Sequence, residues 1–502
     1  MSEKLDKLKT LLAEAYDLEK ASRLISWDEQ TQMPPGGAEG RASMLATLAR
    51  IQHARFTSDE LGRLLEDLSS EMEGTDPDSD DYRLVQVTKR DFDLRHRQPE
   101  SLIAELSRAS SDGFVAWKRA QEARDYSQFA PFMKRNVELN HKVAEALGYK
   151  DRIYDPLFER SEPGMTTAQL EAIFSELKAI ILPLVRQVAG RQGAVDASCL
   201  HQSFDEDTQL RFGLQIVQRF GYDLNRGRLD LAPHPFAASF NRGDVRITTR
   251  LRPNFLSGAL FATMHESGHA MYEQGVDRSY EGTPLARGAS PGVHESQSRL
   301  WENLVGRSRP FQDYLFPRLQ ETFPSQLGRV DKETFYKAIN KVQPSLIRVE
   351  ADEVTYNLHI MLRFELENEM LEGKADVDKL NKIWTERMES YFGIAPADDS
   401  EGVLQDIHWS HAGGFGGFCG YTLGNVINAQ LFKKARASLP DLDGQLSEGE
   451  FGPLLGWLQT NLYRHGRKYT PNELVERITG QPIGTSAWAE YIQGKFSAIY
   501  GL

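Results

Sequence analysis

The residues best suited to chemistry in this sequence form the pattern His265-Glu266-x-x-His269. If the segment is helical, the two histidines lie one turn apart and project side by side, so that both imidazoles can bind one cation. Glu266 projects about 100° away around the same helix, too far to ligate easily but within reach of a water molecule on that cation. The pattern therefore predicts metal-assisted hydrolysis, with Glu266 as the general base.

The residues around this pattern have the spacing of an amphipathic helix. Ser257 is a candidate N-cap and Gly275 a candidate C-terminal stop. The alternative is a core helix with two structural histidines, which is the weaker interpretation because only 12 of the 502 residues are histidine. Apolar and small residues that recur every three or four positions predict a face packed into a core, with the histidines lining a cavity: Leu260, Phe261, Met264, Gly268 and Met271.

A zinc site with two histidines needs a third protein ligand, which should come from a different segment and leave the fourth position for water. The third histidine that follows this pattern in some zinc enzymes is absent, because Gly275 stands in its place, and a carboxylate is therefore favoured. Ser290-Pro291 predicts the start of a helix that runs to about Val305. We expect Glu295, near the start of that helix, to be the third ligand. The alternatives are Glu273, Asp277 and Glu302.

The segment between Leu229 and Leu251 changes from a helical to an extended pattern. Asn241-Arg-Gly243 predicts a turn, and the β-branched residues of Asp244–Arg250 predict a strand after it. The segment is thus expected to form a β-hairpin directly before the metal-binding helix. Its edge could hold an extended peptide by main-chain hydrogen bonds, and a purely structural hairpin is an equally good interpretation.

The remainder of the chain is rich in helix-forming residues. We expect a mainly α fold: a large lobed helical body with a groove, and one small β-hairpin or sheet next to the metal helix. Residues 1–502 are expected to act as one unit, with a helical N-terminal cover at 1–150 and a catalytic body at 151–502. Specific expectations are a first helix ending before Trp27-Asp28, a helix to about Arg55, capping boxes at Thr57-x-x-Glu60 and Thr166-x-x-Gln169, and helix from Lys332 to about Glu372.

Composition limits the possible partners. The formal net charge of −13 argues against a nucleic-acid or anionic-membrane surface, because both require concentrated Lys and Arg. Cys199 and Cys419 are far apart in sequence and predict neither a disulfide framework nor a thiolate zinc site. Residues 1–20 alternate charges with leucines and contain no apolar run typical of a signal peptide or membrane span. We therefore expect a cytoplasmic protein with small or peptidic partners.

Several motifs taken together resemble the carboxypeptidase Taq family. The segments Trp27–Gly37 and Tyr154–Gly164 also match, so the resemblance spans nearly the whole chain. It implies a cytosolic, mostly α-helical, homodimeric metallocarboxypeptidase with a long groove. Such an enzyme removes residues from the free C-termini of peptides with zinc, or cobalt in some members. The shared motifs, in order, are Asp244-Val-Arg-Ile-Thr248, His265-Glu-Ser-Gly-His269, His294-Glu-Ser-Gln297, Ile347-Arg-Val-Glu-Ala-Asp352 and Gly402-Val-Leu-Gln-Asp-Ile-His-Trp409.

The resemblance also implies roles for individual residues. By position in the motifs, His265, His269 and Glu295 match the metal ligands, and Glu266 matches the catalytic base. Arg348 corresponds to the residue that binds the C-terminal carboxylate of the substrate. Further expected residues are His234, His408 and Tyr421 as contacts to the substrate and transition state, and Asp352 as an orienting residue behind the site.

One segment departs from the family pattern. Where the family has Phe-Gly-Tyr-Phe-Pro-Thr-Tyr, this chain has Phe415-Gly-Gly-Phe-Cys-Gly-Tyr421, so that Gly417 replaces a tyrosine, and Cys419 and Gly420 replace Pro and Thr. If that tyrosine stabilises the oxyanion, Tyr421 or a histidine must substitute for it, or the rate falls.

Two other functions are compatible with the motifs. An oligopeptide endopeptidase of similar helical fold would share the metal site but would need no residue that binds a terminal carboxylate. A non-catalytic helical binding protein could hold a structural metal. Glu266 argues against the latter, because structural metal sites close all four positions and need no base beside the ligands.

Overall fold

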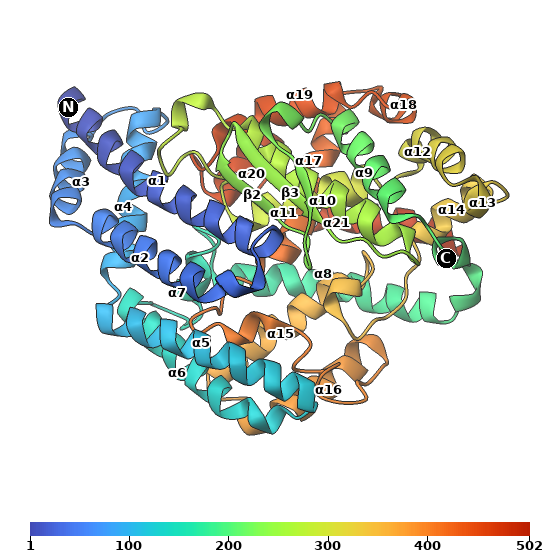
Figure 1. The fold of residues 1–502 in the computed structure, drawn as a ribbon, viewed down its shortest axis with the longest axis horizontal. Helices are drawn as coiled ribbons and strands as arrows, with labels where there is room; N and C mark the ends of the chain where they lie inside the picture. Colours follow the sequence, from blue (N-terminus) through green and yellow to red (C-terminus); the bar gives the residue numbers. More distant parts are fainter. The chain divides into compact units, whose positions relative to one another are not determined.

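The computed structural model describes residues 1–502, except for the side chain of Gln192. Helices dominate, and the strands within the described residues form one three-stranded sheet (Figure 1). This confirms the predicted fold class. In the part of the chain that is described, no helix is both long and apolar enough to cross a membrane.

The chain divides into two compact units that are interleaved in sequence. Each unit contains residues from both predicted regions, 1–150 and 151–502. That residues 1–502 act as one catalytic unit with an N-terminal cover stays a prediction. Unit 1 consists of Met1–Arg95, Asp196–Ile339 and Ile427–Pro482, and unit 2 of His96–Val195, Asn340–Val426 and Ile483–Leu502.

Unit 1 contains the sheet and most of the helices around it. Its N-terminal helices bury an apolar cluster that includes Leu8, Leu68 and Val85 and extends to Leu285, in the loop that follows residue 275. Its helices are α1 (Ser2–Thr31), α2 (Ala38–Phe56), α3 (Asp59–Glu71), α4 (Asp80–His96), α9 (Glu206–Phe220), α10 (Leu256–Gly275), α11 (Pro291–Arg299), the π-helix η7 (Leu300–Val305), α12 (Arg309–Thr322), α13 (Pro324–Leu327), α14 (Lys332–Ile339), α18 (Leu442–Glu448), α19 (Gly452–Asn461) and α20 (Pro471–Thr479).

The sheet has the strand order β1-β3-β2. The strands β2 (Ala237–Asn241) and β3 (Asp244–Thr249) are antiparallel and form the predicted hairpin. Strand β1 (Leu229–Leu231) pairs with β3 in parallel and was not predicted, because three residues are too few to show a strand pattern in the sequence. The edge strand β2 contacts α1, where Lys20 Nζ donates to the Ser239 carbonyl at 2.9 Å. At this point the hairpin edge is occupied by the protein itself.

Three helix starts and ends differ from the sequence prediction. Helix α1 does not stop before Trp27 but continues to Thr31, because Trp27 is buried against Phe240 of β2. The N-cap of α3 is Ser58, whose hydroxyl accepts from Leu61 N, rather than Thr57. Helix α10 starts at Leu256, so Ser257 lies inside the helix and is not its cap.

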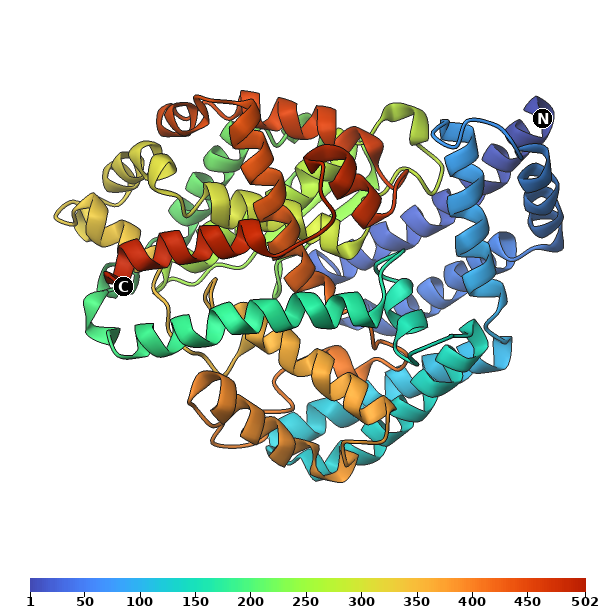
Figure 2. The same cartoon turned by 180° about the vertical axis from the view of Figure 1, so that it is seen from behind.

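Unit 2 is built from long helices and irregular segments. Helices α5 and α6 lie side by side (Figure 2). Thr166 and Gln169 form the predicted capping box at the start of α8. The helices are α5 (Glu100–Ala123), α6 (Ala130–Leu147), α7 (Asp155–Glu159), α8 (Thr167–Ala189), α15 (Tyr356–Leu371), α16 (Leu380–Phe392) and α21 (Ser486–Tyr500); α17 (Gly420–Ser438) contains the unit boundary at 426/427.

The prediction of continuous helix from Lys332 to Glu372 is wrong between residues 340 and 355. This segment is irregular apart from one short 3-10 turn at Arg348–Glu350. Pro344 lacks the N–H that a helix interior requires. The Asp352 carboxylate accepts hydrogen bonds from the backbone of Val354 and Thr355, which stabilises a turn in place of helix. Arg348 therefore lies on a loop.

Candidate active site

Helix α10 presents the two histidines from the middle of unit 1. It packs against β3, α9 and α11, and its buried face includes Leu260, Phe261 and Met264, as the spacing predicted. His265 and His269 are half-buried one turn apart, with ring centroids separated by 5.0 Å. The helix thus supplies two imidazoles on one side of its axis.

Helix α11 brings the third group over α10. The predicted start is confirmed, because the Ser290 hydroxyl accepts from Val293 N at 3.1 Å and Pro291 is the first helical residue. The helices approach closely at Gly268, where a Cβ atom would lie 2.5 Å from the carbonyl oxygen of Gln297. Only a glycine fits there without displacement of the α11 backbone. This close approach brings Glu295 next to the two histidines.

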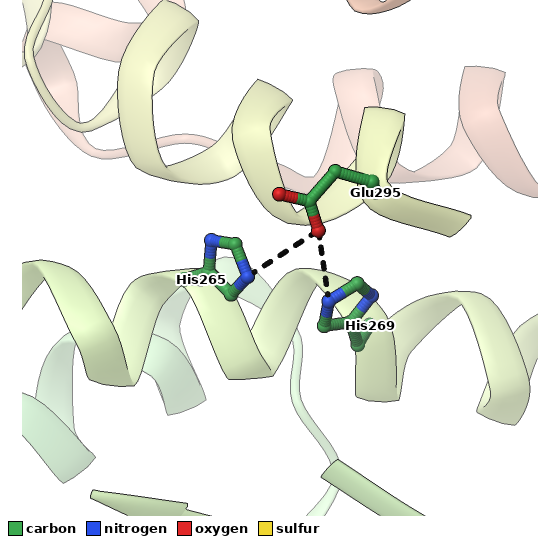
Figure 3. Close-up of side chains that lie close together, drawn as sticks. All are labelled: His265, His269 and Glu295. Atoms are coloured by element: carbon green, nitrogen blue, oxygen red, sulfur yellow. Dashed lines mark ion pairs between the residues drawn. The ribbon is translucent and has the colours of Figure 1, made fainter. Parts of the chain in front are cut away.

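The predicted ligands converge on one point (Figure 3). Glu295 Oε2 lies 3.6 Å from His265 Nε2 and 3.5 Å from His269 Nε2. One ligand atom from each of the three residues lies within 4.8 Å of the others, and no other group of this kind is found in the described part of the chain. Two imidazole nitrogens and one carboxylate oxygen form a donor set that suits a divalent cation.

The outer nitrogen of His265 is held by a carboxylate. His265 Nδ1 lies 2.9 Å from Glu302 Oε2, and Arg299 donates to both Glu302 and Glu295 at 2.9 Å. A nitrogen that binds a metal must offer its lone pair, so the proton of the neutral ring belongs on Nδ1, facing Glu302. Glu302, a rival candidate ligand in the sequence, lies on the far side of the imidazole from the convergence point.

The outer nitrogen of His269 is held through a second histidine. His269 Nδ1 lies 2.6 Å from His294 Nδ1, and His294 Nε2 lies 2.8 Å from Glu273 Oε1. If His269 ligates through Nε2, its Nδ1–H donates to His294, whose Nε2–H in turn donates to Glu273. Glu273 is therefore two hydrogen bonds behind the ligand. The remaining rival, Asp277, caps a 3-10 turn by accepting from Ser279 N.

The charges around the centre favour a cation. Burial lowers the pKa of His269 to about 4, which keeps it neutral and able to ligate. Burial would also lower the pKa of His265, but the charges of Glu295 and Glu302 outweigh it and raise that pKa. Burial raises the pKa of Glu266 to about 7, and Glu295 acts in the same direction while His265 opposes it. Glu266 is 6% exposed and lies next to His265 in sequence.

A second group of predicted residues meets in unit 2. Arg348 is 8% exposed; its Nε donates to Asp406 Oδ2 at 2.6 Å and its Nη1 to the Tyr356 hydroxyl at 3.1 Å. His408 Nδ1 binds the other oxygen of Asp406. The Arg348 guanidinium lies 5.2 Å from the Tyr421 ring. Arg348, His408 and Tyr421 thus form one cluster, with Asp406 at its centre.

Two predicted residues lie apart from these groups. His234 is exposed in unit 1, on the segment between β1 and β2. Asp352 accepts from Gln343 N, Val354 N and the Thr355 hydroxyl, and these bonds brace the loop that carries Arg348.

The glycine-rich segment is a place of close backbone approach within unit 2. Gly416 has a φ of +89°, and a Cβ there would lie 2.4 Å from the Leu157 carbonyl oxygen. Cys419, which departs from the family pattern, is fully buried with its sulfur 3.3 Å from the Tyr154 hydroxyl. The segment thus packs tightly against its own unit.

Sequence reasoning did not predict the contacts that hold the predicted residues in place, although Glu302 is a candidate ligand in the sequence and His294 lies in one of the shared motifs. Asp406 and Arg363 surround Arg348, and Glu302 and His294 stand behind the histidines. One signal was present: Arg363 interrupts an otherwise largely apolar stretch of α15, which is unusual for a buried helix.

Known proteins share the sequence and the fold of this chain. The family model described as carboxypeptidase Taq (M32) metallopeptidase matches residues 7–496. The chain is 42% identical over 489 residues to thermostable carboxypeptidase 1 of Thermus thermophilus, covering 95% of each chain. It is 37% identical to carboxypeptidase 1 of Bacillus subtilis, covering 98% of this chain and 97% of the relative.

Solved structures lead to the same conclusion. The crystal structure of an M32 carboxypeptidase from Deinococcus radiodurans superposes with a TM-score of 0.96 at 41% identity, covering 100% of both chains. A structure titled Pyrococcus furiosus carboxypeptidase Apo-Mg gives a TM-score of 0.95 at 33% identity, covering 99% of each chain. The chain therefore belongs to the carboxypeptidase Taq (M32) family of metallopeptidases, and is a metallocarboxypeptidase that acts on peptides with a divalent metal ion.

Proposed function

We propose that this metallocarboxypeptidase hydrolyses the last peptide bond of peptides with His265, His269 and Glu295 as metal ligands, Glu266 as general base and Arg348 as the residue that binds the terminal carboxylate. The observation that carries the proposal is the convergence of two Nε2 atoms and one carboxylate oxygen beside a buried glutamate. Each role is supported by a separate feature of the structure.

Zinc is the cation we propose, and cobalt fits the same donor set. Both imidazoles have their Nδ1 atoms hydrogen-bonded, which turns the Nε2 lone pairs toward Glu295. When bound, such a cation polarises the scissile carbonyl group and lowers the pKa of a water molecule. Two histidines and one glutamate leave one position open for that chemistry.

Glu266 is proposed to move the proton. Its carboxylate takes a proton from the attacking water, whose oxygen forms the new bond to the carbonyl carbon. It then gives this proton to the amine nitrogen as the C–N bond breaks, so that one carboxylate serves as base and then as acid. A pKa raised by burial to about 7 suits both roles near neutral pH.

Arg348 is proposed to select for a free C-terminus. Its Nε and Nη1 have partners, which fixes the plane of the guanidinium. A planar guanidinium can bind both oxygens of a carboxylate. We propose His408 and Tyr421, beside Arg348, and the exposed His234 as further substrate contacts, and Asp352 as the residue that orients the Arg348 loop.

The test is a set of four rates. Arg348→Ala with a free-acid peptide, and wild type with the C-terminally amidated peptide, should each lose about thirty- to several-thousand-fold in kcat/KM, because a desolvated ion pair loses one partner. Combining both changes should cost little more than one of them. The matched control is Arg135→Ala, a surface arginine paired with Glu105 in the same unit, which should leave all rates unchanged. A variant of Arg348 that still distinguishes acid from amide would refute the proposed role.

We also propose that the enzyme is a cytoplasmic homodimer that uses neither nucleic acid nor membrane partners. The support is the family resemblance, the net charge of −13 and two buried free thiols. Light scattering after gel filtration should give about twice the chain mass of 56.8 kDa.

A further inference from the structure

Asp406 is the centre of a buried charge cluster in unit 2. One carboxylate oxygen, Oδ2, accepts from Arg348 Nε at 2.6 Å and lies 3.5 Å from Arg363 Nη2. The other, Oδ1, is hydrogen-bonded to His408 Nδ1. Asp406 is 8% exposed. A single carboxylate thus contacts two of the residues proposed to meet the substrate, Arg348 and His408, and lies beside one further arginine that is buried.

Arg363 is a cation without hydrogen-bond partners at its tip. It is 1% exposed, and neither terminal nitrogen has a hydrogen-bond partner among the described residues. Its guanidinium lies 4.7 to 5.1 Å from the rings of Trp384, Trp409 and Phe418. The aromatic faces compensate part of the lost hydration, and Asp406 is the nearest opposite charge. Arg363 therefore contributes charge to the cluster rather than donors.

The charges in the cluster do not cancel. Arg348 alone with Asp406 would form a neutral pair, and a neutral pair attracts a substrate carboxylate weakly. With Arg363 included, two cations face one anion, so that Arg348, Arg363 and Asp406 together carry one unit of positive charge. The buried Glu367 also interacts with Arg363 and stands outside this count; its carboxylate is hydrogen-bonded to Trp409, Tyr154 and Gly416. In a poorly solvated region this charge acts over several ångströms. Arg363 thus restores the positive charge that Asp406 removes from Arg348.

Asp406 also fixes the tautomer of His408. A carboxylate can only accept, so the Nδ1 atom of His408 carries a proton. The opposite ring nitrogen, Nε2, then presents a lone pair in the neutral ring. The His408 side chain is 39% exposed, so part of the ring is accessible to a ligand. One residue therefore sets both the position of Arg348 and the hydrogen-bonding character of His408.

We infer that Asp406 is a positioning residue that holds the side chains of Arg348 and His408 in place. We infer also that Arg363 is a buried cation which offsets the charge of Asp406, so that the cluster stays positive toward the substrate's C-terminal carboxylate. The inference deepens the proposed function and rests on the role of Arg348 there. The alternative is that Asp406 and Arg363 only stabilise the fold of unit 2.

The first variant to test is Asp406→Asn. The amide oxygen can replace Oδ2 toward the arginines, which places the NH₂ group against His408 and forces the Nε2–H tautomer. The substitution adds one positive charge, and charge alone would lower KM for a free-acid peptide. We expect KM to rise about ten-fold or more instead, because Arg348 loses the charged partner that positions it, and we expect the ratio of acid to amide rates to fall. In an Arg348→Ala background the same substitution should have no further effect on the ratio of acid to amide rates, because it acts through Arg348. A purely structural Asp406 would give additive losses.

A second readout does not depend on the substrate. Nitrogen-15 NMR of histidine-labelled protein at alkaline pH, with His408 assigned by its loss in His408→Gln, should report Nδ1–H in the wild type and Nε2–H in Asp406→Asn. This measurement separates the role of Arg348 from the role of Asp406. If Arg348→Ala leaves catalysis intact while Asp406→Asn changes the His408 tautomer, the proposal that Arg348 binds the substrate carboxylate fails and the positioning of His408 by Asp406 stands. An unchanged tautomer would overturn the positioning role itself.

The test of Arg363 compares a variant that removes its positive charge with one that keeps it. Arg363→Met should raise KM for the free-acid peptide about ten-fold and leave the amidated peptide unaffected, and Arg363→Lys should restore most of the loss because an ammonium keeps the charge beside the same rings. If Asp406→Asn folds poorly with two uncompensated arginines, Asp406→Asn/Arg363→Met restores the original net charge and still carries the altered tautomer.

The matched control is Asp399→Asn, another carboxylate of unit 2, which binds Tyr126 N at 2.7 Å and Asn381 Nδ2 at 3.2 Å. It should leave the ratio of acid to amide rates at the wild-type value. If Arg363→Lys behaves like Arg363→Met, or if Asp399→Asn changes that ratio as much as Asp406→Asn, the cluster is structural and the inference is wrong.

Discussion

Glu266 differs from the neighbouring carboxylates in the direction of its pKa. Burial alone would raise all of these pKa values. At Glu302 the charges of Arg299 and the contact with His265 outweigh burial and lower the pKa to about 2, and at Glu273 the bond to His294 does the same. At Glu266 burial dominates and the pKa rises to about 7. Of these three glutamates, Glu266 is therefore the one suited to exchange a proton at neutral pH.

Replacing Glu266 by glutamine should separate metal binding from catalysis. Glu266→Gln keeps the size of the side chain and leaves the three ligands untouched, so the variant should retain its metal and lose at least about two orders of magnitude in kcat. Elemental analysis and peptide hydrolysis on the same sample provide the measurement. Near-normal turnover in the metal-loaded variant would exclude Glu266 as the base.

Three glutamates near the histidines should differ in their effect on metal binding. Glu295→Ala removes a proposed ligand, and should lower metal occupancy far more than Glu302→Ala or Glu273→Ala, which remove the groups that contact His265 and His294 from behind. Orienting groups of this kind typically contribute about ten- to a hundred-fold in metal affinity. Dialysis against a weak chelator ranks the three. Loss of metal from Glu302→Ala together with retention in Glu295→Ala would reverse the assignment.

At the residue scale, local spacing in the sequence predicted the candidate site residues but not the residues that contact them. The pairing of His265 with His269 follows from one helical turn, and Glu295 follows from a motif on a single helix. The contact of Glu302 with His265 joins residues 37 positions apart, and that of Asp406 with Arg348 joins residues 58 apart. Such contacts depend on tertiary packing, for which a single sequence has no periodic signal.

Among the elements, the junction of α10 with α11 sets the geometry of the ligands. Gly268 allows the two helices to approach, and the π-helix Leu300–Val305 follows α11 directly and carries Glu302 to His265. π-Turns of this kind are rare and occur often at functional sites. The proposed metal centre thus depends on backbone geometry outside its three proposed ligands.

The substitution Gly268→Ala should weaken metal binding without touching a ligand. The added methyl group would lie 2.5 Å from Gln297 O and 2.7 Å from Ser298 Cα, so α11 must shift away from α10. We expect a loss of about 1 to 3 kcal/mol in stability and about ten-fold in metal affinity. Isothermal titration and urea unfolding measure the two quantities.

The control for this change is Gly40→Ala in α2, where nothing lies within 4 Å of the new Cβ. Because alanine favours helix over glycine, this variant should gain up to about 1 kcal/mol and bind metal normally. Equal metal affinity in Gly268→Ala and the wild type would show that α11 can move without carrying Glu295 out of place.

The sequence predicted elements with regular periodicity and failed where side chains compete with the backbone. The hairpin β2–β3 and the start of α11 were predicted from β-branched residues and an N-cap. The loop that carries Arg348 was predicted as helix, because its composition is helical while Asp352 ties it into a turn. The π-helix could not be predicted from the sequence, because its residues are those of an ordinary buried helix.

On the scale of the whole molecule, the chain passes repeatedly between its two units. Unit 1 requires three separate stretches, and distant parts of it are joined by ion pairs. In one of these, Arg467 binds both oxygens of Asp91, 376 residues earlier. The side chains are 16% and 14% exposed, so this bidentate pair lies largely out of solvent.

Removal of this pair should give a pH-dependent loss of stability. Burial would raise the pKa of Asp91, but Arg467 outweighs it and lowers that pKa below the ordinary value of 3.8. The stabilisation is therefore complete above about pH 5 and is lost as pH falls through the lowered pKa. Asp91→Asn should lose about 3 kcal/mol at pH 7, and this difference from the wild type should shrink in acid.

Urea unfolding between pH 2 and 7 tests this, with Asp313→Asn as the control. Asp313 pairs with Lys332 on the surface, where the side chains are 45% and 55% exposed, so its removal should cost less than about 0.5 kcal/mol at any pH. A difference between Asp91→Asn and the wild type that persists unchanged in acid would mean that the stability comes from packing and not from charge.

The interleaved units also determine the order in which the protein can be completed during synthesis. The last of the proposed metal ligands, Glu295, is synthesised early, but residues 427–482, which complete the same unit, follow more than a hundred residues later. At roughly 5 to 20 residues per second, the nascent chain spends many seconds with the apolar surface of unit 1 uncovered. Because each unit is made of three separate stretches, no single continuous segment of the chain contains one unit complete without part of the other.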